Sequence, residues 1–370
     1  MLPSLIAHPF VDVVAAADPL PQARARFEAD FGGRSFESMA ELAADSGVDA
    51  VYIATPHEFH AHDVVLAAAH GKHALVEKPM ALTLAECGAM VDAARTARTV
   101  LVVGHTHAFD PVVRTMRSIV ESGELGALRM VINVAYTDFL YRPRRPEELD
   151  SARGGGIMYN QVPHQIEIAR ALDGGAVRSA RAVAGSWDPQ RPTEGAMTAL
   201  LEFASGAAAS LTYSGYDRFD SDEFAFWVAE SGAEKHASPG ATQRELDARD
   251  LADEAQFKAQ SGFSGRGVAQ TARPTHQPHF GMLLASCERG DLRPSADGVL
   301  VYDARGMREI ALPLGRTFPD KDGVIDEFYE AIVCGIAPLH DGAWGRATVE
   351  VALALVASAR ERREIVLTPA

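Results

Sequence analysis

The sequence predicts an α/β fold with a doubly wound parallel sheet, followed by a second α+β domain with an open, mostly antiparallel sheet. Strand-like and helix-like segments alternate through the first hundred residues, strand-like segments then follow one another after about Asp110, and the chain returns to helix at its end. Alternation is typical of parallel sheets, and strands joined by short turns are typical of antiparallel sheets. We therefore expect a first domain over 1–110, rejoined by a helix at about 343–361, and a second domain over 111–342.

Composition argues against several classes of protein. The 370 residues suffice for two domains, and a hydrophobic content of 47% is ample for their cores. The 50 acidic residues outnumber the 35 basic ones, for a net charge of −15, which argues against nucleic acid or an anionic membrane as a partner. No apolar segment is long enough to span a membrane, the first residues lack a signal-peptide pattern, and three scattered cysteines are typical of a reducing cytoplasm.

Four apolar runs in the first domain end abruptly at an acid, a proline or a glycine and are expected to be strands: 11–18, 48–54, 73–77 and 100–103. Helical periodicity separates them at 36–46, 59–71 and 83–97. The last of these helices should begin after Thr83, because Glu86 three residues later completes a capping-box pattern.

The second domain is expected to begin with a helix at 112–122 and to contain another at 161–172. Its predicted strands are 128–136, 177–185, 198–203, 207–213, 223–230 and 299–302. Residues 233–277 are polar and are interpreted as a long surface insertion. Helices at 324–334 and 343–361 and a short strand at 365–367 complete the chain.

Lys78 is the most informative residue. It follows a buried strand and stands between Glu77 and Pro79. Open α/β sheets bind their ligands at the carboxyl ends of their strands, so this lysine is a candidate for proton transfer; the alternative is a strand end that faces solvent. To accept a proton at neutral pH, its pKa would have to fall from about 10.4 to roughly 7–8 through desolvation or nearby positive charge.

The N-terminal region departs from a complete dinucleotide-binding domain. Such a domain normally opens with a strand and a G-x-G-x-x-G loop, whereas Met1-Leu2-Pro3-Ser4-Leu5 resembles the helix that follows the loop. Asp18 then ends the next strand, where an acid binds the adenosine ribose. We expect the missing strand and loop, about 10–20 residues, to lie upstream of Met1. N-terminal sequencing of the natively expressed protein tests this.

Four motifs, taken in this order and spacing, resemble those of the glucose–fructose oxidoreductase / inositol dehydrogenase (Gfo/Idh/MocA) family. They are Thr55-Pro56 with His60, Val76-Glu77-Lys78-Pro79, Gly104 with Phe109-Asp110-Pro111, and Gly154-Gly155-Gly156 with Asn160 and His164. The resemblance spans nearly the whole chain. It implies a Rossmann domain, a second domain with an open sheet, NAD(P)-dependent hydride transfer and a homo-dimer or homo-tetramer.

The resemblance also implies roles for individual residues. The catalytic pair is Lys78 and His164; the alternative for His164 is a structural histidine paired with Glu167. The family usually has aspartate at the position of Asn160, which places acid–base chemistry on the pair. No arginine follows Asp18 closely, so NAD is expected rather than NADP. The cofactor-binding set is Asp18, Thr55, Pro56, His60, Glu77, Lys78 and His105, and the substrate-binding set is His107, Tyr141, Arg142, Arg144, Arg145 and Asn160.

The basic run Tyr141–Pro146 is unusual in an acidic chain. Its arginines could form salt bridges within or between subunits, or bind a carboxylate-bearing substrate. The surrounding segment, 136–149, resembles that of bacterial phthalate 4,5-cis-dihydrodiol dehydrogenases, which oxidise a dihydrodiol of a benzene dicarboxylate to the catechol. The expected substrate is therefore a small anion. A sugar or inositol dehydrogenase, and a non-catalytic sensor or scaffold with a defective cofactor site, stay open as alternatives.

Two histidine-rich segments superficially resemble metal sites. His57-Glu58-Phe59-His60-Ala61-His62 has Ala61 where an H-E-x-x-H helix needs its second histidine. His105-Thr106-His107 lacks an evident third ligand. We therefore expect no metal.

Overall fold

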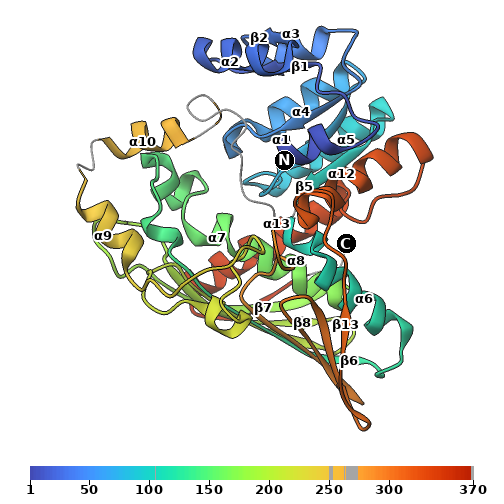
Figure 1. Ribbon diagram of the computed structural model, residues 1–370, viewed down its shortest axis with the longest axis vertical. Coiled ribbons are helices and arrows are strands. Elements are labelled where there is room, and N and C mark those ends of the chain that lie inside the picture. Colours follow the sequence, from blue (N-terminus) through green and yellow to red (C-terminus); the bar gives the residue numbers. More distant parts are fainter. Residues whose placement is uncertain (105, 250–252, 262, 264–273, 368–370) are drawn as a thin grey trace. The chain divides into compact units, whose positions relative to one another are not determined.

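The structure, a computed structural model, describes residues 1–104, 106–249, 253–261, 263 and 274–367 (Figure 1). Its contacts divide the chain into two compact units. Unit 1 comprises Met1–Gly104, Ala252–Thr271 and Val324–Val349, and unit 2 comprises His105–Leu251, Ala272–Gly323 and Glu350–Ala370. Helix α13 (Gly342–Glu361) begins in unit 1 and ends in unit 2.

Unit 1 alternates helices and parallel strands. Its helices include α1 (Leu2–Ala7), α2 (Pro21–Phe31), α3 (Met39–Ala44), α4 (His60–Ala69) and α5 (Leu84–Ala97). Its strands are β1 (Ala15–Ala17), β2 (Arg34–Phe36), β3 (Ala50–Ile53), β4 (His73–Glu77) and β5 (Leu101–Gly104). Strand β1 pairs with β2, and β3, β4 and β5 form a separate sheet in that order. Within the described residues no strand connects the two sheets.

Local sequence explains these elements. Strand β4 matches the prediction because Leu75 and Val76 are fully buried and the Glu-Lys-Pro sequence ends the run. Helix α5 begins as predicted, with the Thr83–Glu86 capping box formed. The helix predicted at 36–46 starts later, because residues 34–36 form β2 and Ser38 then caps α3 by accepting a hydrogen bond from the Glu41 amide.

Unit 2 is built on a nine-stranded sheet. Its strands are β6 (Leu128–Tyr136), β7 (Val177–Gly185), β8 (Ala196–Phe203), β9 (Ala208–Ser214), β10 (Met282–Cys287), β11 (Gly290–Pro294), β12 (Gly298–Asp303), β13 (Gly306–Ala311) and β14 (Ile365–Val366). The spatial order is β13-β12-β11-β10-β6-β9-β8-β7-β14. All neighbours are antiparallel except β6 and β9, so the predicted open, mostly antiparallel sheet is confirmed.

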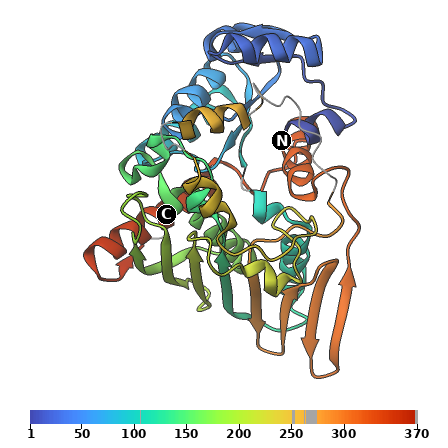
Figure 2. The same ribbon diagram turned by 60° about the vertical axis from the view of Figure 1, so that its left-hand side comes forward.

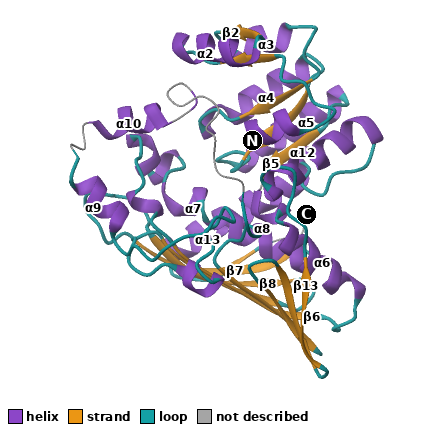
Figure 3. Cartoon of the chain, in the orientation of Figure 1, coloured by secondary structure: helices purple, strands orange, loops and turns teal. Residues whose placement is uncertain are grey.

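One face of this sheet carries helices α6 (Pro111–Ser122) and α8 (Val162–Asp173), which Figure 3 shows against the strands. The hairpin of β12 and β13 forms one edge of the sheet (orange in Figure 2). Burial alternates along β8, with Leu201 fully buried and Leu200 exposed. The face away from the core therefore presents apolar side chains, including Met130, Val183 and Leu200.

The prediction of a strand at 223–230 was wrong. Residues Ser221–Ala225 form a 3₁₀ turn, η6, which the Asp220 side chain caps. Phe226 and Trp227 then adopt positive φ angles of 62° and 58°, which no strand tolerates. The segment interpreted as a polar insertion contains helices α9 (Ala241–Asp247) and α10 (Glu254–Ser261). Within the described chain, no helix combines the length and the apolar character that crossing a membrane requires.

Candidate active site

The strand ends of unit 1 carry the residues expected to bind the cofactor. Because parallel strands end at the same edge, Thr55 and Pro56 after β3 lie on the same side of their sheet as Glu77 and Lys78 at the end of β4. Thr55 and Pro56 are exposed, and Lys78 is half-buried. His105, which was also expected in this set, lies outside the described residues.

His60 joins the ends of β3 and β4. Its ring is fully buried; Nδ1 lies 2.9 Å from the carbonyl oxygen of Pro79, and Nε2 lies 2.9 Å from that of Thr55. Both ring nitrogens therefore contact the protein backbone. The ring joins the loops that carry the exposed groups, and the expected contact of His60 with cofactor stays a prediction.

The backbone on both sides of Lys78 is anchored. On one side, Tyr52 donates a hydrogen bond to the Glu77 carboxylate at 2.5 Å, and the Lys78 amide donates to the same carboxylate at 3.3 Å. On the other side, the Pro79 carbonyl oxygen lies 2.9 Å from Nδ1 of His60. Burial and the neighbouring Glu77 raise the pKa of Tyr52, so its hydroxyl remains a donor. Lys78 is thus presented from a fixed main chain.

Asp18 lies directly after β1 and is half-buried. One of its carboxylate oxygens accepts a hydrogen bond from the Leu20 amide at 2.8 Å. Arg24, one turn into α2, donates to the main-chain oxygens of Asp18 and Pro19, at 2.7 and 3.0 Å. A carboxylate accepts hydrogen bonds from the hydroxyls of a ribose, so this strand end fits the sugar of a dinucleotide.

In unit 2, the glycine-rich motif forms the start of α7 (Gly156–Asn160). Gly156 has a φ of 74°, and a Cβ atom there would lie 2.1 Å from the Thr193 hydroxyl, so only glycine fits. The Asn160 amide group donates to the carbonyl oxygens of Gly154 and Gly156, at 3.2 and 2.8 Å. Asn160 therefore closes the loop that precedes α8, the helix of His164.

His164 is 5% exposed and packs against two rings. The His107 ring lies 4.7 Å away between centroids at an interplanar angle of 82°, and the Phe280 ring lies 5.0 Å away. Glu167, considered above as a partner of His164, lies 3.5 Å from the buried Arg170. The orientation of the His164 ring is thus set by edge and face contacts with aromatic neighbours.

His107 is held by two carboxylates. Its Nδ1 lies 3.1 Å from Asp110 and its Nε2 lies 3.0 Å from Glu230. Burial opposes the charge, but the two carboxylates prevail and raise the pKa of His107 to about 10. Burial likewise opposes charge on Glu230, yet His107 and Arg142 lower its pKa to about 2. Both ring nitrogens of His107 thus face carboxylates, and its expected contact with substrate stays a prediction.

Most of the basic run forms salt bridges within the subunit. Arg142 pairs with Asp138 at 2.7 Å, and Arg145 lies 3.4 Å from Glu147. The buried Tyr141 donates to Asp188 at 3.0 Å, and burial together with this carboxylate raises its pKa to about 12. The salt bridges within the subunit that the sequence left open as an alternative are therefore present for Arg142 and Arg145.

Arg144 differs from its neighbours because its side chain is only 11% exposed. Its guanidinium lies 3.7 Å from the centre of the Phe139 ring and donates to the Phe139 carbonyl at 2.8 Å. The nearest oxygen of Glu148 is 3.9 Å away, and burial lowers the pKa of Arg144 to about 10. A buried cation stacked on an aromatic ring is a suitable receptor for an incoming carboxylate.

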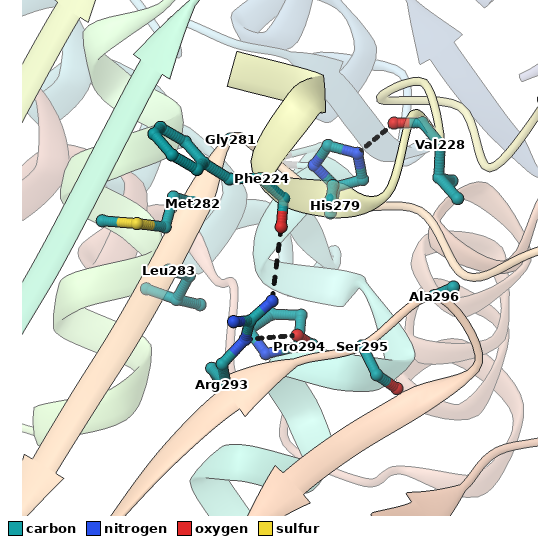
Figure 4. Close-up of a pocket in the computed structure, with 11 residues that line it drawn as sticks. Phe224, Val228, His279, Gly281, Met282, Leu283, Arg293, Pro294, Ser295 and Ala296 are labelled. Atoms are coloured by element: carbon teal, nitrogen blue, oxygen red, sulfur yellow. Dashed lines mark hydrogen bonds between the residues drawn. The ribbon is translucent and has the colours of Figure 1, made fainter. Parts of the chain in front are cut away.

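Two site residues were missed by sequence reasoning. Asp110 belongs to a recognised motif but was not assigned a role, and Glu230 was placed in a strand that does not exist. Glu230 is held by His279, whose amide donates to the Glu230 carbonyl at 3.3 Å. The His279 ring contacts the Val228 carbonyl at 2.7 Å, beside a pocket that also contains Phe224 and Arg293 (Figure 4).

Across the described residues, no three His, Cys, Asp or Glu side chains are placed to hold a metal ion.

A parallel sheet with an acid and a lysine at its strand ends, in a chain with a second α+β unit, defines a dinucleotide-dependent oxidoreductase. Two family models match: "Oxidoreductase family, NAD-binding Rossmann fold" at residues 1–105 and "GFO/IDH/MocA C-terminal domain" at residues 113–231. The chain belongs to the GFO/IDH/MocA oxidoreductase family. The predicted family, fold class and NAD dependence are thereby confirmed.

Individual relatives support this assignment. A 1-carboxy-3-chloro-3,4-dihydroxycyclohexa-1,5-diene dehydrogenase from Comamonas testosteroni is 40% identical over 96% of this chain and 90% of its own. A crystal structure from Bordetella bronchiseptica RB50, assigned as a dehydrogenase, is 44% identical with a TM-score of 0.94, covering 99% of this chain and 96% of its own. A scyllo-inositol 2-dehydrogenase (NAD(+)) from Bacillus subtilis (strain 168) is 28% identical over 56% of this chain and 60% of its own.

Proposed function

We propose that the protein oxidises a cis-dihydrodiol bearing at least one ring carboxylate to the corresponding catechol, with NAD as hydride acceptor. The first candidate substrate is phthalate 4,5-cis-dihydrodiol, the cis-dihydrodiol of a benzene dicarboxylate. The relative from Comamonas testosteroni supports this class, since its name describes a carboxylated, dihydroxylated cyclohexadiene. Oxidation of such a ring is favourable because the product is aromatic.

Arg144 is the observation that carries the proposal. It is a guanidinium in a largely buried position, stacked on Phe139 and fixed by the Phe139 carbonyl. A polyol offers this cation only neutral hydroxyl oxygens, whereas a ring carboxylate would pair with it by charge. A charge-assisted hydrogen bond of this kind contributes about 1.5–3 kcal/mol, enough to separate anionic from neutral substrates.

Bound NAD would supply the hydride acceptor, and the residues that would hold it are Asp18, Thr55 and Pro56. In the proposed reaction, the substrate hydroxyl loses its proton to Lys78 as its carbon loses hydride. His164 is proposed to hydrogen-bond the reacting oxygen. The hydroxyketone formed then tautomerises to the catechol: its ring carbon loses a proton and its carbonyl oxygen gains one. Fixed main chain around Lys78 and fixed rings around His164 reduce the cost of orienting both groups.

Self-association is proposed to use the outward face of the nine-stranded sheet. Met130, Val183 and Leu200 are 45%, 65% and 47% exposed on its strands. Clustered apolar side chains of this kind often mark interfaces between subunits. Light scattering on the wild type and on Leu200→Glu tests this: the proposal requires a homo-dimer or homo-tetramer that the substitution weakens.

The reaction is tested by product analysis. Purified protein, NAD and phthalate 4,5-cis-dihydrodiol should yield NADH and dihydroxyphthalate in a 1:1 ratio, measured by absorbance and by chromatography. Myo-inositol and uncharged cis-benzene dihydrodiol serve as comparison substrates. If only the polyol is oxidised, the proposal is wrong in its substrate. If NAD binds but no substrate in the series is oxidised, the proposed reaction is wrong.

A further inference from the structure

Glu230 lies close to the buried histidines His107 and His164, and its charge also interacts with Arg142 of the basic run. Its carboxylate lies 3.0 Å from Nε2 of His107, the ring that packs against His164. The charge of Arg142, in the basic run, also acts on Glu230 and lowers its pKa. Glu230 therefore lies within electrostatic range of both the substrate-binding segment and the buried histidines.

The segment that carries Glu230 is held in place. His279 binds it twice, through its amide to the Glu230 carbonyl and through its ring to the Val228 carbonyl (Figure 4). An isolated antiparallel bridge between Val228 and Glu234 adds a third restraint. Glu230 is thus delivered to His107 from a defined position, although it follows an irregular turn.

The geometry requires His107 to be charged. Carboxylates contact both of its ring nitrogens, and only an imidazolium can donate to two acceptors. Asp110 is fully buried, so one side of this arrangement is shielded from water. The three side chains together carry one net negative charge, beside the His164 ring.

We propose that Glu230 is a positioning residue for His164: together with Asp110 it clamps His107 as an imidazolium, and this clamp fixes the orientation and the proton affinity of His164. The proposal rests on the role proposed for His164 in substrate oxidation. Its chemical consequence is that the surplus negative charge of the clamp favours the protonated state of His164. Loss of one carboxylate should therefore make that state harder to reach.

Other charged and titratable groups lie near the clamp, and the test must separate their effects from the effect of Glu230. Arg142 acts on Glu230 and pairs with Asp138. His279 also acts on Glu230, and Tyr213 lies near Arg142 and Glu230. These groups are unchanged in a variant that alters Glu230 alone, so a shift measured in that variant belongs to the clamp.

The kinetic test compares Glu230→Gln with Glu234→Gln. Both remove one negative charge from the same segment, but the Glu234 side chain is exposed. We expect Glu230→Gln to lower kcat about 10-fold, the scale seen when a group that orients an active residue is lost. KM should stay within threefold, and the acid limb of the kcat profile should move to lower pH. Glu234→Gln should behave as the wild type.

Two results would overturn the proposal. One is a Glu230→Gln variant with wild-type kcat and an unmoved pH profile. The other is a loss of activity fully explained by unfolded protein, as measured by circular dichroism, with the remaining folded enzyme titrating normally. Asp110→Asn provides a second variant, which should move the same limb in the same direction.

A spectroscopic test separates this proposal from the proposed function. In protein labelled with ¹⁵N-histidine, the two His107 ring nitrogens should both carry protons at pH 8.5, and Glu230→Gln should lower the pH at which they are lost. His164 should titrate at a lower pH in the same variant. A neutral His107 in the wild type at pH 8.5 contradicts the clamp, whatever substrate the enzyme uses. Failure to oxidise any dihydrodiol, with these titrations intact, contradicts only the proposed function.

Discussion

Arg144 and Phe139 form a cation–π pair, with the guanidinium carbon 3.7 Å from the ring centre and a guanidinium nitrogen donating to the Phe139 carbonyl at 2.8 Å. The pair orients the buried guanidinium without neutralising its charge. Arg144 lies 3.9 Å from Glu148, farther than Arg142 from Asp138 at 2.7 Å or Arg145 from Glu147 at 3.4 Å. Arg144 is therefore the arginine of this run best suited to recognise a substrate anion.

Arg144→Ala should weaken binding of a carboxylated dihydrodiol. Loss of a charge-assisted hydrogen bond of about 1.5–3 kcal/mol corresponds to a rise in KM of roughly 10–150-fold. The effect should be small for the uncharged cis-benzene dihydrodiol, which has no carboxylate to lose a partner. Arg129→Ala, at an exposed surface ion pair, is the matched control. An equal loss with both substrates would assign Arg144 to folding rather than recognition.

Lys78→Ala is expected to lower kcat at least about 100-fold, the usual scale for a proton-transfer group. Lys78→Arg should be similarly impaired, because arginine keeps its charge and cannot accept a proton. NAD affinity, measured by titration calorimetry, should change much less in both variants. Should Lys78→Arg retain turnover within threefold of the wild type while chemistry limits the rate, the proposed base would have to be another group.

His60→Ala should destabilise the protein, because the carbonyl oxygens of Pro79 and Thr55 lose their buried contacts. The expected decrease in the free energy of unfolding is roughly 1–3 kcal/mol, measured by urea denaturation. His62→Ala is the control, since that side chain is 71% exposed. Similar midpoints for the two variants would show that His60 does not join the strand ends.

The His107–Glu230 pair should make stability depend on pH. The pKa of His107 is raised to about 10, so its contribution is complete below the unfolded value of about 6.5 and is lost as pH rises through 10. The pKa of Glu230 is lowered to about 2, so its contribution is complete above about 4.3 and is lost as pH falls through 2.

Wild type and Glu230→Gln should therefore differ most in urea stability between about pH 4.3 and 6.5, the window in which both contributions are complete. The difference should shrink toward pH 10. A difference that grows across that range would contradict the assigned charges.

Sequence patterns predicted the elements whose signals are local. Strand β4 is an apolar run with a clear end, and helix α5 begins at a capping box, so both were located from neighbouring residues alone. The short strand β2 has the sequence Arg-Ser-Phe, which has no strand signature. Strand β13 is largely exposed and polar, and was missed for the same reason.

The residues of the candidate site likewise divide into those with a local sequence signal and those without one. Lys78 and His164 lie in motifs that a single segment reveals. The His107–Glu230 contact joins residues 123 positions apart, and no local pattern encodes it. Glu230 was further obscured by the hydrophobic segment before it, which resembles a strand until the positive φ angles of Phe226 and Trp227 interrupt it.

Substrate charge distinguishes the proposed dihydrodiol dehydrogenase from a sugar or inositol dehydrogenase of the same family. With saturating NAD, kcat/KM is determined for phthalate 4,5-cis-dihydrodiol, for uncharged cis-benzene dihydrodiol and for myo-inositol. We expect kcat/KM for the dicarboxylate to be at least about 10-fold above either of the others, the smallest effect expected from one charge-assisted contact. An equal or higher value for myo-inositol would contradict this expectation.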